Sequence, residues 1–260
     1  MPATSGKPAV LLDIDGVLHI GGEPIAGATA ALDELRELSA GVRLVTNTTS
    51  KSRREILDQL HGLGFDVAVH EVLTPAALAV GHCQERKHRS VRLLVGAALL
   101  EDLAELAEAQ PGRPVDAIVL GDLGHGFTAE VLNEAFRALI DGAELIALQH
   151  NRYWRSADGL VLDVGAYSAA LEYGAGCEAV VVGKPAPDFF AAALATLGAE
   201  AGTTVMVGDD IEADVAGAIA AGLRGVLVRT GKYRRDTLDA SAVTPSAIVD
   251  SICDVPALLR

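Results

Sequence analysis

The pattern of hydrophobic positions predicts four short buried strands, each followed at once by polar residues. Helical patterns separate these strands along the chain. Such alternation is typical of an α/β protein with a largely parallel sheet. Ligands of such sheets bind beyond the carboxyl ends of the strands, so we expect the polar residues to meet in one crevice. The strands and polar groups are 9–12 with Asp13-Ile14-Asp15, 42–45 with Thr46-Asn47, 179–182 with Gly183-Lys184, and 204–207 with Gly208-Asp209-Asp210.

Three of the strands are followed by apolar residues at helical spacing. Residues 52–55 have the spacing of a capping box, and the helix that they begin is expected to end before Gly64. The other two helices are expected to end at Gly198 and Gly222, because glycine favours the left-handed conformation that closes a helix. The apolar positions are Ile56, Leu60 and Leu63 in the first helix, Phe190, Leu194 and Leu197 in the second, and Val215 and Ile219 in the third.

The stretch between the second and third strand groups, about 100 residues long, far exceeds an ordinary connection. It has an α/β pattern of its own, and we therefore expect an inserted domain. The predicted strands are 92–95, 117–120 and 145–148, and Leu132, Phe136 and Leu139 mark a helix face.

Composition and charge limit the classes of partner. A chain of 260 residues suffices for one large domain or two unequal ones. Mean hydropathy is +0.31, yet no uncharged apolar run approaches the roughly 20 residues that span a bilayer. The formal charge of -14 opposes the basic surface that nucleic acids require. We expect neither a membrane nor a nucleic acid among the partners.

Cysteine and histidine usage predicts no disulfide and no zinc site. Cys83, Cys177 and Cys253 have neither CxxC nor Cys/His metal spacing, which fits reduced thiols. The seven histidines show no metal-ligand spacing and are interpreted as polar surface or loop residues. Residues 1–12 are too weakly hydrophobic for a secretory signal, so we expect a cytoplasmic protein. A homodimer is compatible with the sequence, which does not determine the oligomeric state.

The candidate chemistry begins with Asp13 and Asp15, which place two carboxylates in a tight loop before Gly16. Such a loop is also an ordinary turn, because Asp and Gly are favoured turn residues. Lys184, Asp209 and Asp210 add a cation and two carboxylates to the same predicted crevice. Converging carboxylates repel one another unless a cation binds among them, and hard oxygen ligands suit Mg²⁺.

Four segments resemble the motifs of the haloacid dehalogenase superfamily and occur in that family's order. The long insertion between the second and third resembles that of class IIA, the NagD-like capped phosphatases. The resemblance implies an α/β fold: a Rossmann-like core with a doubly wound parallel sheet, residues 1–77 and 180–260, and an inserted α/β cap domain, residues 78–179. The segments are DIDGVL at 13–18, TNTTSKS at 46–52, GKPAPDFF at 183–190 and GDDIEAD at 208–214.

The resemblance further implies a magnesium-dependent phosphatase. Asp13 would be the nucleophile that forms a phosphoaspartate, and Asp15 the general acid and base. Mg²⁺ would be held by the carboxylates of Asp13 and Asp209 and the backbone carbonyl of Asp15. Lys184, Thr46 and Asn47 would bind the phosphoryl oxygens, and Asp210 and Asp214 would support the metal and Lys184 from behind.

Asp15 departs from the most similar members of that class, which carry serine there as we interpret the resemblance. An aspartate restores the acid/base of the wider superfamily and favours ordinary phosphate monoesters over phospholysine or phosphohistidine. The expected substrate is a small phosphorylated molecule, or else a phosphorylated side chain. Three alternatives stay open: a phosphomutase, a dehalogenase that uses Asp13, and a non-catalytic phosphoacceptor module.

A hairpin is predicted at 152–164, with its turn at Asp158-Gly159. Its first strand begins with Arg152, Tyr153, Trp154 and Arg155, two cations and two aromatics that are suited to gripping the leaving group of a substrate. The alternative is an ordinary hairpin strand, with one pair of side chains on each face.

Overall fold

The computed structural model describes residues 6–156 and 159–260, and the chain divides into two compact units. The core unit comprises the chain up to Thr46, Arg54–Leu73 and Lys184–Arg260. The inserted unit comprises Asn47–Arg53 and Thr74–Gly183. The inserted unit thus takes in more of the chain than the predicted residues 78–179, including the separate segment Asn47–Arg53.

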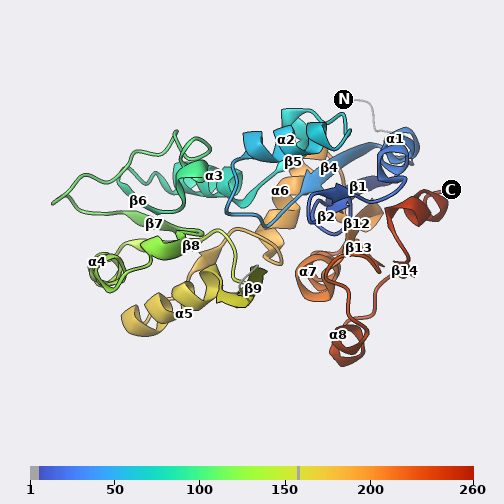
Figure 1. The fold of residues 1–260 in the computed structure, drawn as a ribbon. Helices are drawn as coiled ribbons and strands as arrows, with labels where there is room; N and C mark the ends of the chain where they lie inside the picture. Colours follow the sequence, from blue (N-terminus) through green and yellow to red (C-terminus); the bar gives the residue numbers. More distant parts are fainter. Residues whose placement is uncertain (1–5, 157–158) are drawn as a thin grey trace. The chain divides into compact units, whose positions relative to one another are not determined.

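Six parallel strands of the described chain form the sheet of the core unit, in the order β14-β13-β12-β1-β4-β5 (Figure 1). The chain runs from the central β1 outward through β4 and β5, then returns to the other side of β1 as β12. This reversal makes the sheet doubly wound, and ligands of such sheets bind at the reversal point. The strands are β1 (Ala9–Asp13), β4 (Gly41–Val45), β5 (Val72–Leu73), β12 (Thr204–Gly208), β13 (Arg224–Val228) and β14 (Ala247–Val249).

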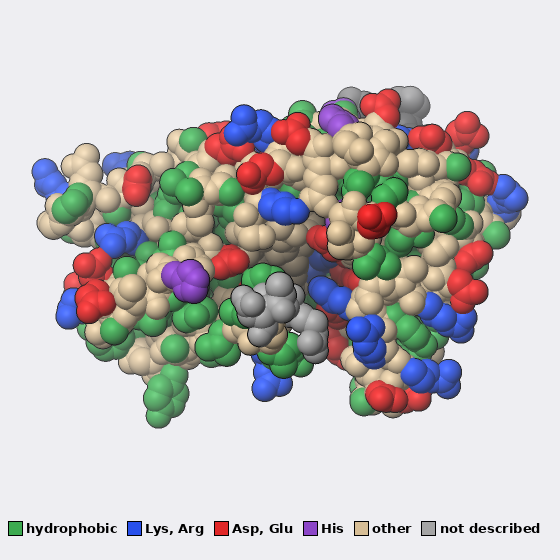
Figure 2. Space-filling view, viewed as in Figure 1, with side chains coloured by type: hydrophobic (Ala, Val, Ile, Leu, Met, Phe, Trp, Pro, Cys, Tyr) green, Lys and Arg blue, Asp and Glu red, His purple; other side chains and the backbone are tan. Residues whose placement is uncertain are grey.

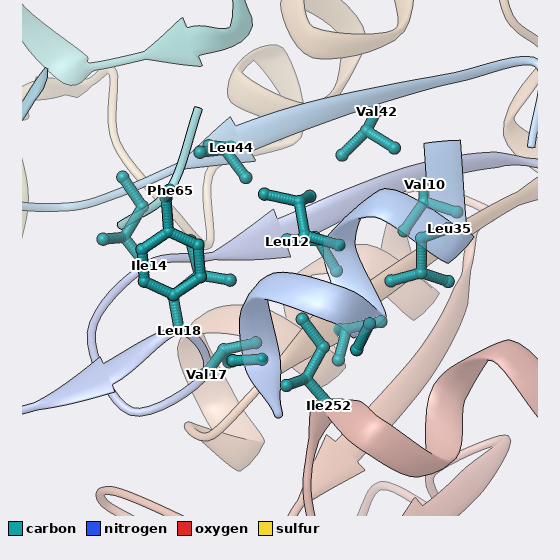
Figure 3. Close-up of a cluster of buried hydrophobic side chains, with 14 of the residues drawn as sticks. Val10, Leu12, Ile14, Val17, Leu18, Leu35, Val42, Leu44, Phe65 and Ile252 are labelled. Carbon is teal, nitrogen blue, oxygen red and sulfur yellow. The ribbon is translucent and has the colours of Figure 1, made fainter. Parts of the chain in front are cut away.

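The core strands are nearly continuous apolar runs because the sheet is covered on both faces. All five residues of β1 are buried. Figure 3 shows Val10 and Leu12 of β1 pointing toward Leu35 of α1 and Ile252 near the C-terminus. The helices of this unit are α1 (Ala28–Leu38), α2 (Arg53–Gly62), α6 (Pro187–Leu197), α7 (Gly217–Ala220) and α8 (Arg235–Ala240).

Successive side chains of β13 point to opposite faces of the core sheet, and their contacts show what covers the second face. Val226 and Val228 belong to the cluster of Figure 3, whereas Leu227 between them packs with Ile211 and Val215. Those two residues lie on a π-helical turn, Ile211–Ala216, which leads into α7. The third predicted helix is therefore a π-helical turn followed by one short α-helix. A small antiparallel pair, β2 (His19–Ile20) and β3 (Glu23–Pro24), follows β1.

The inserted unit has its own parallel sheet, in the order β11-β8-β7-β6, and the antiparallel hairpin β9-β10. Helices α3 and α5 have no counterpart among the predicted elements, whereas α4 carries the predicted helix face. The elements are α3 (Pro75–Arg86), β6 (Val91–Leu94), β7 (Ala117–Leu120), α4 (Ala129–Ile140), β8 (Glu144–Ala147), β9 (Tyr153–Ser156), β10 (Gly159–Leu162), α5 (Val164–Ala175) and β11 (Val180–Val181).

The strand predicted at 179–182 belongs to the inserted unit, which corrects its assignment to the core. Val180 pairs with Ile146 and Val181 with Ala147, both in β8. The physical reason is that an apolar run signals burial without identifying the sheet that buries it. Lys184 then opens the next segment of the core unit.

The predicted hairpin is present, with Trp154 paired to Val161 and Tyr153 to Leu162. Both aromatic side chains are exposed. Asp158, half of the predicted turn, lies outside the described residues, as does the side chain of Arg155, so the predicted division of the four side chains between two faces stays a prediction.

Acidic and basic side chains are interspersed on the face of the molecule drawn in Figure 2. Within the described part of the chain, every helix is too short or too polar to cross a membrane.

Candidate active site

The register of the core sheet brings the predicted site residues of three strands to one edge. Asp13 ends β1 and pairs with Val45 of β4, so Thr46 follows at the same level. Leu12 pairs with Val207 of β12, and Asp209 comes directly after that strand. Parallel strands place their carboxyl ends together, which explains why residues far apart in the sequence become neighbours here.

Lys184 is buried between two carboxylates. Its Nζ donates to Oδ1 of Asp13 at 2.5 Å and to Oδ1 of Asp214 at 2.6 Å. Only 2% of Lys184, 6% of Asp13 and 1% of Asp214 is exposed. Burial alone would lower the pKa of Lys184, but Asp13 and Asp214 raise it above its ordinary value. The lysine is therefore a permanent cation that fixes both carboxylates.

Asp214 reaches this position because the chain turns tightly after β12. Oδ1 of Asp210 accepts from the backbone N–H groups of Glu212 and Ala213, both at 3.0 Å, and so caps the π-helical turn. The backbone N–H of Asp210 in turn donates to Oδ2 of Asp214 at 3.2 Å. A Cβ at Gly208 would lie 2.2 Å from that of Asp214, so the close approach requires glycine.

Asp209 is held by backbone on two sides. Its Oδ2 accepts from the backbone N–H of Lys232 at 2.7 Å. Gly16 and Gly231 both have positive φ, and a Cβ on either would lie 1.9 or 2.0 Å from the same oxygen. The hydroxyl of Thr230 donates to the carbonyl of Gly16 and joins the two loops. The loops after β1 and β13 thus close around one carboxylate.

The other oxygen of Asp209 identifies what the site can hold. Oδ1 is buried and has no hydrogen-bond partner among the described residues, although buried polar atoms are nearly always paired. Asp13, Asp209 and Asp214 offer three carboxylate oxygens within 4.8 Å of one another. One buried lysine does not balance three carboxylates, and oxygen ligands are those that Mg²⁺ prefers. The residues therefore fit a hard divalent cation.

The pKa values of the cluster reflect its burial first and its excess of negative charge second. Burial raises the pKa of Asp209 to about 7, and Asp214 adds to the effect. Burial likewise raises the pKa of Asp13 well above its usual range, against the attraction of Lys184. A nearby cation favours the ionised carboxylates, so a bound metal ion would oppose both shifts.

Asp15 lies in the loop after β1 with its side chain exposed, and its Oδ1 is 3.7 Å from Nε2 of His19. The backbone N–H of Gly16 donates to the carbonyl of His19 at 2.7 Å, which keeps the loop tight. Only 3% of His19 is exposed, so its interpretation as a polar surface residue is wrong.

Thr46 and Asn47, the two predicted phosphate ligands, fall in different units. Thr46 is buried at the end of β4 in the core unit. Asn47 belongs to the inserted unit, where a Cβ on Gly183 would lie 2.9 Å from its Oδ1. The structure thus brings together Asp13, Thr46, Lys184, Asp209, Asp210 and Asp214 in the core unit.

The loop of Thr230, Gly231 and Lys232 is a part of the site that the sequence motifs did not predict. Besides its backbone contact with Asp209, Lys232 places Nζ 3.7 Å from Oδ2 of Asp210. A signal existed, because β13 is a fifth apolar run followed by polar residues, like the four that were singled out. Asp214 was expected behind the metal, whereas its carboxylate belongs to the candidate donor group itself.

Comparison with known proteins connects this geometry to a family. Residues 10–110 match the family described as haloacid dehalogenase-like hydrolase, and residues 181–255 match the HAD-hydrolase-like family. The p-nitrophenyl phosphatase from Archaeoglobus fulgidus is similar in structure, with a TM-score of 0.89 and 29% identity over 97% of this chain and 99% of that one. NagD from E. coli has a TM-score of 0.85 and 25% identity, over 95% of this chain and 98% of its own.

Curated relatives extend the similarity over nearly the whole chain. The phospholysine phosphohistidine inorganic pyrophosphate phosphatase of Rattus norvegicus is 40% identical over 263 residues, 98% of this chain and 95% of the relative. The haloacid dehalogenase-like hydrolase domain-containing protein 2 of Bos taurus is 42% identical over 238 residues, 92% of this chain and 89% of the relative. Given these relatives and the strand-end cluster of carboxylates and lysine, the chain belongs to the haloacid dehalogenase-like hydrolases of the NagD-like class.

Proposed function

We propose that this hydrolase is a magnesium-dependent phosphatase that cleaves small phosphate monoesters through a phosphoaspartate on Asp13. The observation that carries the proposal is the buried carboxylate cluster, in which Lys184 bridges Asp13 and Asp214 beside the unpartnered Oδ1 of Asp209. A cluster with one cation and an unpaired oxygen suits a divalent ion and a phosphate together. The phosphatases among its relatives support the same activity.

The carboxylates of Asp13 and Asp209, with the backbone carbonyl of Asp15, would hold Mg²⁺. When bound, the ion supplies positive charge that offsets the repulsion between an anionic nucleophile and an anionic phosphate. Asp214 keeps Lys184 in place and lies close enough to join the ligands or to orient them.

In the first half-reaction the carboxylate of Asp13 attacks phosphorus. A bond forms between an oxygen of Asp13 and phosphorus, the bond to the leaving oxygen breaks, and Asp15 donates a proton to that oxygen. Lys184 stabilises the negative charge on the transferring phosphoryl group, and Thr46 and Asn47 hydrogen-bond its oxygens.

In the second half-reaction water attacks phosphorus and displaces Asp13. Asp15, now ionised, accepts a proton from the attacking water, and inorganic phosphate leaves. The exposed position of Asp15 suits both tasks, since it can meet the leaving group and solvent.

The proposal is tested by release of p-nitrophenol from p-nitrophenyl phosphate. We expect activity with Mg²⁺, its loss in excess EDTA, and no turnover by Asp13→Asn with an unchanged circular dichroism spectrum. Full activity in excess EDTA would contradict the proposed metal requirement. A kcat of one tenth of the wild-type value or more in Asp13→Asn would contradict the role of Asp13 as nucleophile. Accumulation of a stable phosphoprotein without turnover would indicate the phosphoacceptor alternative.

The role of Asp15 is tested with two leaving groups. Asp15→Asn should slow an alkyl phosphate more than p-nitrophenyl phosphate, because nitrophenolate leaves without needing a proton. An equal loss on both substrates would remove Asp15 from the acid role.

The substrate class is tested with a panel of phosphorylated metabolites, phospholysine, phosphohistidine and pyrophosphate, with phosphate release as the readout. We expect the highest kcat/KM for a compact phosphate monoester. Preference for a phosphoramidate or pyrophosphate would contradict the proposed substrate.

A further inference from the structure

Two histidines and a glutamate converge in the inserted unit. His82 lies on α3, His88 follows the end of that helix, and Glu144 begins β8. Nε2 of His82 is 2.9 Å and Nε2 of His88 is 2.8 Å from the same atom, Oε2 of Glu144. Each of the three residues offers one potential ligand atom, and these atoms all lie within 4.8 Å of one another. Three potential metal-ligand atoms therefore point at one place.

The turn after α3 explains how two histidines that are not at helical spacing meet. Lys87 ends the helix in the left-handed conformation, with a φ of 60°. Among the described residues other than glycine, it alone has a positive φ. The backbone N–H of His88 then donates to the carbonyl of Cys83 at 2.9 Å. The chain folds back at this point and brings His88 beside His82.

The carboxylate of Glu144 is the meeting point of the cluster. Its Oε2 faces both imidazoles, at 2.9 Å from Nε2 of His82 and 2.8 Å from Nε2 of His88. Both imidazole Nε2 atoms face the same carboxylate oxygen, so a metal ion bound here would take the place of the two His–Glu144 contacts. Arg86, the other charged neighbour, lies 3.4 Å from Oε1 and leaves Oε2 to the histidines.

Neighbouring groups define the character of the site. Cys83, the residue after His82, is buried and does not belong to the three residues whose ligand atoms converge. The side chains of His82, His88 and Glu144 are 20%, 14% and 22% exposed, which lets an ion and a water molecule enter. Two imidazoles and a carboxylate suit Zn²⁺ far better than Mg²⁺.

We propose that His82, His88 and Glu144 form a binding site for a divalent transition-metal ion, with Zn²⁺ as the best match and water in the fourth position. Tetrahedral zinc keeps its ligand atoms roughly 3.3 Å apart, so Glu144 needs to withdraw only a few tenths of an ångström from the imidazoles. The ion joins the end of α3, the following turn and β8, and thereby stabilises the inserted unit. Because Glu144 lies 56 residues beyond His88, sequence spacing did not predict this zinc site.

The proposal is tested by equilibrium dialysis of the full chain against Zn²⁺, with excess Mg²⁺ present to occupy the carboxylate cluster of the core unit. We expect one tightly bound Zn²⁺ per chain. His82→Asn and His88→Asn should each weaken binding by more than about 100-fold, since losing a ligand exceeds the 10–100-fold cost of losing its supporting contacts.

His150→Asn is the matched control. Nε2 of His150 lies 3.2 Å from Oε2 of Glu172, so it is also a histidine paired with a glutamate. No second histidine completes that pair among the clusters of three ligands found in the described chain. This variant should bind Zn²⁺ like the wild type.

Glu144→Gln separates a metal site from a hydrogen-bonded cluster, because its amide oxygen still accepts from an imidazole. We expect a melting temperature close to that of the wild type without metal, and a much smaller increase on adding Zn²⁺. The proposal would be overturned if the wild type bound Zn²⁺ no more tightly than His88→Asn does. It would also be overturned if His150→Asn lost as much Zn²⁺ affinity as His88→Asn.

Discussion

At the scale of single residues, Lys184 decides whether the charges of the core site are tolerable. It contacts Asp13 and Asp214 within 2.6 Å, and all three side chains are nearly inaccessible to water. A buried carboxylate without a partner is costly, whereas a paired one is held in a single orientation. The lysine therefore serves both the fold and the proposed phosphoryl transfer.

Lys184→Met keeps most of the side-chain volume and removes the charge. We expect a loss of about 3–5 kcal/mol in the free energy of unfolding, and a decrease of about 100-fold or more in kcat/KM for p-nitrophenyl phosphate. Chemical denaturation and steady-state kinetics measure the two effects.

Lys232→Met is the control for Lys184. It retains the backbone N–H that Asp209 accepts from, and the ammonium that it removes is exposed and lies 3.7 Å from Oδ2 of Asp210, so we expect a loss of under about 1 kcal/mol. Equal destabilisation by the two substitutions would contradict the special position of Lys184.

At the scale of elements, strand ends could be predicted from the sequence better than the sheets to which they belong. Asp13 and Asp209 follow the apolar runs 9–12 and 204–207, which form β1 and β12 in the structure. Because these two strands are parallel neighbours, the two carboxylates come together. The run at 179–182 carries the same local signal, but its partner, β8, is set by packing within the inserted unit. The local hydrophobic pattern therefore does not indicate which of the two sheets the run 179–182 joins.

Contacts between distant segments could not be predicted for the same reason. The meeting of Glu144 with His82 and His88 depends on where β8 lies relative to the turn after α3. The loop after β13 likewise contributes a backbone N–H to Asp209, and an N–H group has no signature in the sequence.

Gly231 in that loop lies against the carboxylate of Asp209, and Gly231→Ala tests whether this contact positions it. Its new Cβ would overlap Oδ2 of Asp209, and the positive φ of 60 adds backbone strain. We expect the Mg²⁺ concentration for half-maximal activity to rise at least about tenfold, as for other losses of contacts that orient a metal ligand.

Gly222→Ala is the matched control for Gly231→Ala. Gly222 also has positive φ, at 84, but its nearest neighbour would be Cβ of Ala201 at 3.5 Å. Both variants lose roughly 1 kcal/mol of stability to the backbone, and only Gly231→Ala should change the metal requirement. An unchanged requirement in Gly231→Ala would show that the loop does not position Asp209.

At the scale of the whole molecule, the raised carboxylate pKa values link stability to pH and to metal. The pKa of Asp209 is about 7 in the folded chain against an ordinary value of 3.8. The folded state thus holds a proton that the unfolded state has released, so this contribution to stability is complete below the unfolded pKa and is lost as pH rises through 7. A cation at the cluster replaces that proton.

The expected result is a larger increase in melting temperature on adding Mg²⁺ at about pH 8 than at about pH 5.5. Differential scanning calorimetry with and without the ion measures both shifts. Asp209→Asn should reduce the difference between the two pH values, and the raised pKa of Asp13 would account for what is left of it. The same increase at both pH values in the wild type would contradict the linkage.

The order of strands in the core sheet also bears on how the protein is made. β1 leaves the ribosome early, whereas its neighbour β12 is synthesised much later. The backbone pairing of Ala9 with Thr204 can therefore form only late in synthesis. The strands of the inserted unit lie between these two, so that unit can complete its sheet during synthesis. A truncated nascent chain that ends before β12 would therefore have a folded inserted unit and an unpaired edge of β1. The hydrolase becomes competent only once its last third has been translated.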